Sequence, residues 1–222
     1  MTSAEVIDFA SLTESFLAAQ LAGDRKEALR VVVEDGLGRG ARVIDLQARV
    51  IRPAQHALGR MWQENRVTIA QEHLATGISQ LVMTRLFEFL PATPRNGVIV
   101  TVACVEGENH ELPVRIVADY LHHAGFTVRY PGAGMSTSQL IDDLRAQMPA
   151  LLALSITMSF NARALREAVK RIREELGGTL TIIVGGHALD SLPGIASELG
   201  VETAQSSPDE LMDSVRRLTG VS

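Results

Sequence analysis

Apolar residues follow two different spacings along the chain, and the change falls about ninety residues from the start. Over residues 11–90 they recur every three or four positions, as in Leu74, Ile78 and Leu81. This spacing is typical of amphipathic helices, and no alternation of the kind found in strands interrupts it. The first part of the chain is therefore predicted to form four or five helices.

Local start and stop signals place three of these helices. One begins at Asp24 and ends at the glycines of residues 36–40, and a second begins at the Arg-Pro pair of residues 52–53. A third covers about residues 69–90. Residues 90–97, LPATPRNG, hold two prolines and an Asn-Gly pair, which indicate a linker.

After the linker the apolar residues gather in short continuous runs that alternate with helical patterns. The runs cover residues 98–105, 126–130, 150–156, 180–186 and, weakly, 201–205. Continuous runs are typical of strands covered on both faces, and their alternation with helices favours a parallel sheet. We predict an α/β fold with an N-terminal all-α domain: a helical bundle over residues 1–92, then a flavodoxin- or Rossmann-like, doubly wound sheet of five strands over residues 96–222.

Composition and charge narrow the function classes. The 222 residues carry a net charge of −5 with a pI near 5.7, and Lys and Arg do not cluster on one segment, so direct nucleic-acid binding is not expected. The single cysteine, Cys104, excludes an intrachain disulfide and a zinc site of several thiolates, and favours a reducing compartment. The acidic N-terminus and the lack of a long apolar run predict a cytoplasmic protein without a membrane anchor.

A histidine and a glutamate lie just after the first predicted strand. Ligands of doubly wound sheets bind at the carboxyl ends of the strands, which is where Glu108 and His110 fall. A carboxylate two residues away can accept a hydrogen bond from one ring nitrogen of His110 and leave the lone pair of the other nitrogen for a metal. The alternative is that His110 belongs to an ordinary surface loop.

Further residues suited to a ligand follow the third and fourth strands. Ser155 and Thr157 offer hydroxyls, and Gly185-Gly186 permits close approach of a backbone to a bulky group, although a polar strand end and an ordinary turn would need the same residues. No GxGxxG or GxxxxGK[ST] sequence follows the first strand, which disfavours a nucleotide held in a phosphate loop.

The helical half contributes a third group, Trp62 with Glu72 and His73. Trp62 is the only tryptophan, and burial against a neighbouring helix is its simplest role. Glu72 and His73 fit either a solvated helix face or a cleft that needs acid, base or hydrogen-bonding groups. Adjacent positions on a helix point about 100° apart and no HExxH occurs, so zinc binding is not expected there. A catalytic triad is disfavoured as well, because the GxSxG elbow is absent.

With these residues in place, the sequence resembles cobalamin-binding proteins that have a helical cap followed by a B12-binding domain, from about Leu17 to Leu218. That family carries D/E-x-H-x-x-G after the first strand, a serine motif after the third and a Gly-Gly pair after the fourth. Here these are Glu108-Asn-His110-Glu-Leu-Pro113, Ser155-Ile-Thr157 and Gly185-Gly186.

The resemblance implies roles for these residues. His110 becomes the lower axial ligand of cobalt, with Glu108 as its hydrogen-bonding partner. The displaced dimethylbenzimidazole tail then inserts beside Ser155 and the two glycines. Pro113 replaces the motif glycine and Thr157 the usual leucine, so helix entry and tail packing are expected to differ.

The spacing Trp62-x9-Glu72-His73 resembles adenosylcobalamin photoreceptors related to light-responsive MerR-like repressors. The resemblance assigns these three residues to the upper face of the corrin and implies that light breaks the cobalt–carbon bond. Only about fifteen residues precede the bundle, so no helix-turn-helix is expected, and the output passes through a protein partner or homo-oligomer. Related photocobilins also hold a bilin, which makes noncovalent biliverdin a second expected cofactor.

Two other functions remain open. One is a corrinoid protein that carries a methyl group within a methyltransferase system. The other is a cobalamin store or chaperone. The three residues at the proposed upper face favour the sensor, because a bulky side chain there would hinder repeated access by methyl donors and acceptors. A sensor would not itself be an enzyme.

Overall fold

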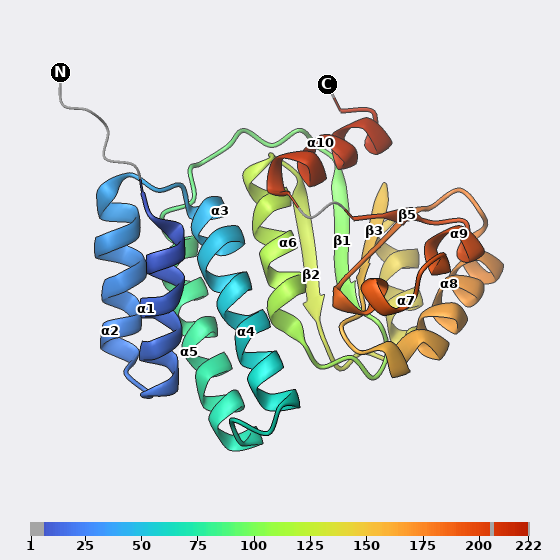
Figure 1. The fold of residues 1–222 in the computed structure, drawn as a ribbon. Coiled ribbons are helices and arrows are strands. Elements are labelled where there is room, and N and C mark those ends of the chain that lie inside the picture. The colour runs from blue at the N-terminus through green and yellow to red at the C-terminus, as the bar shows by residue number, and fades with distance from the viewer. Residues whose placement is uncertain (1–6, 205–206, 222) are drawn as a thin grey trace. The chain divides into compact units, whose positions relative to one another are not determined.

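A computed structural model describes residues 7–204 and 207–221 of the chain. The chain divides into two compact units, residues 1–91 and residues 92–222 (Figure 1). Within the described residues, no helix combines the length and the apolar character that crossing a membrane requires.

The first unit is entirely helical over its described residues, and four continuous helical stretches lie side by side within it (Figure 1). They are α1 (Phe9–Leu21); α2 (Arg25–Leu29) with η1 (Arg30–Gly36) and η2 (Leu37–Arg39); α3 (Val43–Leu46) with η3 (Gln47–Ile51) and α4 (Arg52–Gln63); and α5 (Ile69–Phe87). The expected number of helices is therefore confirmed.

Side-chain caps fix where several of these helices begin. The Asp24 carboxylate accepts from the Glu27 N–H at the start of α2, as the sequence predicts. Thr68 and Gln71 form a reciprocal capping box at the start of α5. Gly40 adopts a left-handed conformation, φ +91°, directly after η2, so the stretch that begins near Asp24 ends at the expected glycines.

The α-helix α4 begins at Arg52 with Pro53 in its first turn, as the sequence predicts, but the helical path was not expected to be continuous from Val43 through α3 and η3. The π-helical segment η3 lies directly before the proline, and the helix continues through Pro53. Pro53 has no N–H to offer the Arg49 carbonyl one turn earlier. The Thr13 Oγ1 of α1 lies 2.9 Å from that carbonyl and 2.7 Å from Phe9 O of its own helix, so its one proton is shared between two acceptors. A tertiary contact thus replaces part of the bond that proline removes.

The second unit is a five-stranded parallel sheet flanked by helices, as predicted. Its strands are β1 (Ile99–Cys104), β2 (Thr127–Gly132), β3 (Leu151–Ser155), β4 (Thr181–Gly185) and β5 (Glu202–Thr203), in the order β2-β1-β3-β4-β5. Its helices are α6 (Glu111–His123), α7 (Thr137–Gln147), α8 (Ala162–Leu176), α9 (Ile195–Leu199) and α10 (Pro208–Thr219), with short 3-10 turns η4 (Ser159–Asn161) and η5 (His187–Ser191). β5 is shorter than the predicted run, whose last residue, 205, lies outside the described residues.

The two faces of the sheet have different covers. One face packs a core with α7, α8 and α9, to which Leu152, Leu154 and Ile156 contribute from β3 and the residue after it. The other face is covered by α6 and α10, which contact β3 and each other. Because successive side chains of a strand alternate between faces, Ala153 and Ser155 point toward the α6 and α10 side.

The order of the strands reverses between β1 and β3. From β1 the chain crosses to β2 on one side, and the next crossover places β3 on the other side of β1. The loops after these two strands therefore leave the sheet in opposite directions, and a crevice at their carboxyl ends is the usual place for a ligand. The loops that carry Glu108 and Thr157 begin there.

Candidate functional site

The buried Glu108 carboxylate is the centre of this site. Only 1% of its side chain is exposed, while half of the His110 side chain is exposed. Gly107, in a left-handed conformation with φ +81°, turns the chain sharply after β1 and brings Glu108 back beneath the loop. Residues close together in sequence thereby place one side chain inside and its neighbour at the surface.

Five donors converge on the two oxygens of this carboxylate. Oε1 accepts from the backbone N–H of His110 at 3.1 Å and contacts His110 Nδ1 in a short hydrogen bond. Oε2 accepts from Thr157 N at 2.8 Å, Met158 N at 3.0 Å and Asn161 Nδ2 at 3.1 Å. The loop after β1 is thus tied to the loop after β3 through a single side chain.

These contacts decide the charge of Glu108. Burial by itself raises the pKa of the carboxyl group, because a charge loses its hydration. Hydrogen bonds from the His110 side chain and from the backbone N–H groups of Met158, Thr157 and His110 outweigh burial and hold the pKa at about 2. The group is therefore a carboxylate at neutral pH.

An ionised Glu108 fixes the tautomer of His110. A carboxylate can only accept, so Nδ1 of His110 carries the proton and the lone pair lies on Nε2. The ring stands at the N-cap position of α6, and Pro113 is the third residue of that helix, where a missing N–H costs no intrahelical bond. The Glu108 carboxylate thus gives an oriented imidazole at the rim of the sheet.

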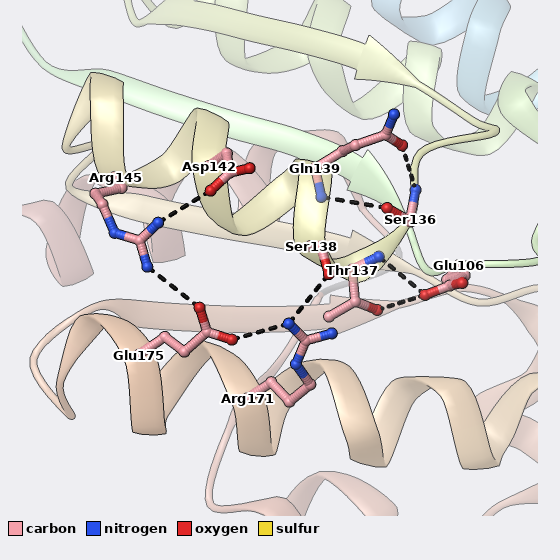
Figure 2. A network of polar contacts seen from close by, with 9 residues as sticks. All are labelled: Glu106, Ser136, Thr137, Ser138, Gln139, Asp142, Arg145, Arg171 and Glu175. Atoms are coloured by element: carbon pink, nitrogen blue, oxygen red, sulfur yellow. Dashed lines mark hydrogen bonds and ion pairs between the residues drawn. The ribbon is translucent and has the colours of Figure 1, made fainter.

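A second carboxylate, Glu106, holds the same loop from the opposite side. Glu106 Oε2 accepts from both the backbone N and the Oγ1 of Thr137, each at 2.9 Å, at the start of α7 (Figure 2). The pKa of Glu106 is lowered by these two hydrogen bonds. Sequence reasoning missed Glu106 and Asn161. Asn161 directly precedes α8, where it would be predicted as a helix cap, but its amide serves Glu108 instead.

The outer side of the α7–α8 pair carries an ion-pair network rather than a site. Arg145 bridges Asp142 and Glu175, and Arg171 joins Glu175 to the Ser138 hydroxyl (Figure 2). All of these side chains are partly exposed, so each pair contributes little to stability. The network joins α7 and α8 on the sheet face opposite α6.

A row of small side chains crosses the carboxyl ends of three strands. Cys104 pairs in register with Ser155, and Ser155 pairs with Gly185. The Ser155 Oγ is buried and has no hydrogen-bond partner among the described residues, and the same holds for the Thr157 Oγ1. Buried polar atoms without partners are uncommon, because they lose water without replacing it. Each of these two hydroxyls can pair with a polar atom of a ligand.

The two glycines after β4 are explained by the protein itself. A Cβ on Gly186 would fall 2.1 Å from the Ile156 carbonyl oxygen, and φ of Gly186 is +115°. A Cβ on Gly185 would fall 2.8 Å from Cβ of Ala204. Both positions therefore exclude side chains because neighbouring loops pack against them, and direct contact of either glycine with a ligand stays a prediction.

The residues singled out in the helical unit lie at its surface. Trp62 is 39% exposed, so it is not a core residue, and the His73 side chain is 75% exposed. Glu72 is held by a hydrogen bond from Thr76 Oγ1 at 2.7 Å. The same hydroxyl lies 3.1 Å from Gln55 Oε1 of α4, which joins the facing helices.

This contact sets the register of α4 against α5. Two turns further along α4, Trp62 lies on the same helix face as Gln55, and one turn earlier along α5, Glu72 lies on the same face as Thr76. α4 and α5 are antiparallel, so moving forward along α4 and backward along α5 leads to the same end of the pair. Trp62 and Glu72 therefore lie at one end of the α4–α5 pair. An exposed indole and an exposed imidazole next to a carboxylate offer a surface for a large, partly apolar ligand.

Comparison with known proteins agrees with both units. A B12 binding domain family matches residues 12–86, and a second family of the same description matches residues 98–202. The chain is 30% identical over 200 residues to the HTH-type transcriptional repressor CarH of Myxococcus xanthus, a match that covers 88% of this chain and 64% of the repressor. The chain thus spans just under two thirds of that relative.

Solved structures show the same fold. The monomethylamine corrinoid protein of Methanosarcina barkeri superimposes with a TM-score of 0.82 at 15% identity, over 95% of this chain and 100% of that one. The methanol:cobalamin methyltransferase complex MtaBC of the same organism gives a TM-score of 0.50 at 17% identity, over 95% of this chain and 80% of that one. With a B12 binding domain matched by its helical unit and another by its sheet unit, the chain belongs to the cobalamin-binding domain proteins.

Proposed function

We propose that the chain is a cobalamin-binding light sensor in which His110 is the lower axial ligand of cobalt. The observation that carries the ligation is the contact between His110 Nδ1 and the buried, ionised Glu108, which places the imidazole lone pair on Nε2. Neutral imidazole nitrogen is a common ligand of transition metals, and a carboxylate on the other nitrogen raises its basicity. The half-exposed ring is accessible to a large cofactor.

The remaining residues of the sheet unit fit the nucleotide tail of the same cofactor. Cys104, Ser155 and Gly185 form a row of small residues. The buried Ser155 hydroxyl has no hydrogen-bond partner among the described residues, and a polar atom of the tail would supply one. Glu108 and Glu106 hold the loop that carries His110, so the ligand is oriented before the cofactor arrives. Binding then requires little ordering of the chain.

Light sensing is the finer part of the proposal. Trp62, Glu72 and His73 match the trio of the adenosylcobalamin photoreceptors, and the repressor relative points the same way. Bound adenosylcobalamin would supply a cobalt–carbon bond that visible light breaks. Trp62 would pack over the upper ligand, and Glu72 and His73 would offer hydrogen bonds beside it. Loss of that ligand would change how the helical unit associates with a partner protein or a second copy.

The structural neighbours favour a second candidate, a corrinoid protein that passes a methyl group within a methyltransferase system. The fold suits both functions, so the upper ligand separates them. A biliverdin site stays a prediction, because no described contact or relative bears on it.

The deciding measurement is the elution volume on gel filtration of the protein reconstituted with adenosylcobalamin, in darkness and after green light, with the absorbance spectrum showing that the cobalt–carbon bond has broken. A sensor changes its spectrum and its elution volume on gel filtration after illumination. An elution volume that stays the same after photolysis refutes light sensing and leaves the methyl carrier, which is then tested with methylcobalamin and a thiol acceptor. Trp62→Ala should weaken the preference for the adenosyl form, and Phe89→Ala, which removes a similarly exposed aromatic ring, should not.

Ligation is tested separately. His110→Ala should lose the spectrum of histidine-ligated cobalt, while His187→Ala should keep it. His187 is a matched control, because its Nδ1 also contacts a carboxylate, Asp190 at 2.9 Å, and it too follows a strand of the sheet. If His110→Ala keeps the spectrum, His110 is not the cobalt ligand.

A further inference from the structure

Two hydroxyls after β3 are buried and without hydrogen-bond partners among the described residues. They are Ser155 Oγ, on the last residue of the strand, and Thr157 Oγ1, two residues later. One such group is explained by one polar atom of a ligand. A ligand pairs both of them only if it offers hydrogen-bonding atoms within reach of each, and a hydroxyl that stays unpaired keeps its desolvation penalty.

The backbone shows that both hydroxyls point to the same face of the sheet. Ile156 donates its N–H to Gly185 O at 2.9 Å and accepts from Ala188 N at 3.3 Å, so both of its polar groups point toward β4. The flanking groups point the other way: the Ser155 carbonyl accepts from Val105 N, and the Thr157 N–H donates to Glu108. The extended alternation of the strand thus continues through Thr157.

The side chains follow this alternation. Ile156 is buried in the core with α7 and α8, so Ser155 and Thr157 lie on the opposite face, toward α6 and α10. Positions two apart in an extended chain are separated by roughly 6.6 Å, which is comparable to the width of a two-ring base. The row of small side chains that includes Cys104 and Gly185 lies on the same face.

The bases found in corrinoid tails differ in how many polar atoms they offer. Dimethylbenzimidazole has one ring nitrogen besides the one bonded to the ribose, and its far edge carries two methyl groups. Adenine has three further ring nitrogens and an amino group. With dimethylbenzimidazole beside Ser155 and Thr157, one of the two hydroxyls can be paired and the other faces hydrocarbon. With adenine, both can be paired.

We propose that Thr157 is a specificity-determining residue that favours a corrinoid whose lower base is a purine, such as adenine, over one with dimethylbenzimidazole. The inference rests on the proposed cobalamin site and adds the class of tail that the site prefers. Ser155 supplies the hydrogen bond that either base can use, and Thr157 supplies the one that only the purine can use.

The test compares dissociation constants of adeninyl-cobamide and dimethylbenzimidazolyl-cobamide for the full chain, measured by titration calorimetry and by the spectrum of histidine-ligated cobalt. The two cofactors release their bases from cobalt with different ease in solution. We therefore compare the ratio of the two dissociation constants between the wild type and Thr157→Val, and the difference between the free cofactors cancels in that comparison. Thr157→Val removes the hydroxyl at nearly constant volume. The ratio should move about tenfold toward dimethylbenzimidazole, and Thr157→Ser should restore it.

Thr101→Val is the matched control. The Thr101 Oγ1 is also buried without a described partner, but Thr101 pairs in register with Leu152 and so lies on the α7 and α8 face. Its ratio should equal that of the wild type. Equal ratios for Thr157→Val and the wild type overturn the inference while both cofactors still bind. Cobinamide, which lacks the nucleotide, is tested as well. If the wild type binds neither cobamide and does not bind cobinamide, the proposed cobalamin site is refuted instead.

Discussion

Replacing Glu108 by glutamine tests whether one buried carboxylate holds the two site loops together. The change keeps the shape of the side chain but removes its charge and turns one acceptor atom into an NH2 donor. If the amide nitrogen takes the place of Oε2, it faces the N–H groups of Thr157 and Met158 and the amide of Asn161, which lose their acceptor. Unpaired buried donors are costly, at about 1–3 kcal/mol each.

The pKa of Glu108 gives an independent magnitude. The difference between the ordinary value of 4.5 and about 2 corresponds to roughly 3 kcal/mol of folding free energy. Because the folded-state pKa is depressed, this contribution is present in full above pH 4.5 and is lost as the pH falls toward 2. We therefore expect Glu108→Gln to lose about 3 kcal/mol near neutral pH and progressively less in acid.

Urea denaturation of the apoprotein, followed by far-ultraviolet circular dichroism between about pH 7 and pH 3, measures this difference. Fluorescence of Trp62, the only tryptophan, reports on the helical unit, whose transition should not move. Glu202→Gln, a change at an exposed position on β5, should stay within about 0.5 kcal/mol of the wild type. A loss below about 1 kcal/mol, or a loss that does not shrink in acid, refutes the reasoning.

Two further predictions concern the same strand ends. Gly186→Ala should lower the unfolding free energy by at least about 3 kcal/mol, because the new Cβ would overlap the Ile156 carbonyl in a left-handed backbone. Gly178→Ala is the control, because a Cβ there meets nothing within 4 Å, and it should change the unfolding free energy by less than about 0.5 kcal/mol. Thermal or urea unfolding checks both, and equal losses would contradict the first. Burial, with smaller effects from Glu108 and Glu111, raises the pKa of Cys104 from 9.0 to about 12. In the folded protein its thiol should therefore react with iodoacetamide roughly a thousandfold more slowly than an exposed cysteine does. Mass spectrometry follows the labelling, and rapid reaction without unfolding would show that the thiol is accessible.

The amino-acid sequence by itself determined the elements and their class. Helical spacing up to residue 90 and five apolar runs beyond it predicted the helical unit and the parallel sheet, because the period of the apolar residues reflects which faces are buried. The same runs placed Glu108, His110 and Ser155 at strand ends, since the end of an apolar run is a local feature. The Asp24 cap and the glycines after it were predictable for the same reason.

Only the tertiary structure decided how those residues are paired. Glu108 meets Thr157, Met158 and Asn161 about fifty positions away because β1 and β3 are neighbours in the sheet, and strand order is not written in any one segment. The helical path continues through Pro53, and a hydroxyl of another helix reaches the carbonyl that would have faced the missing N–H. Local sequence specifies which groups each segment offers, whereas hydrogen-bond partners and buried orphan atoms depend on crossovers and packing that bring distant segments together.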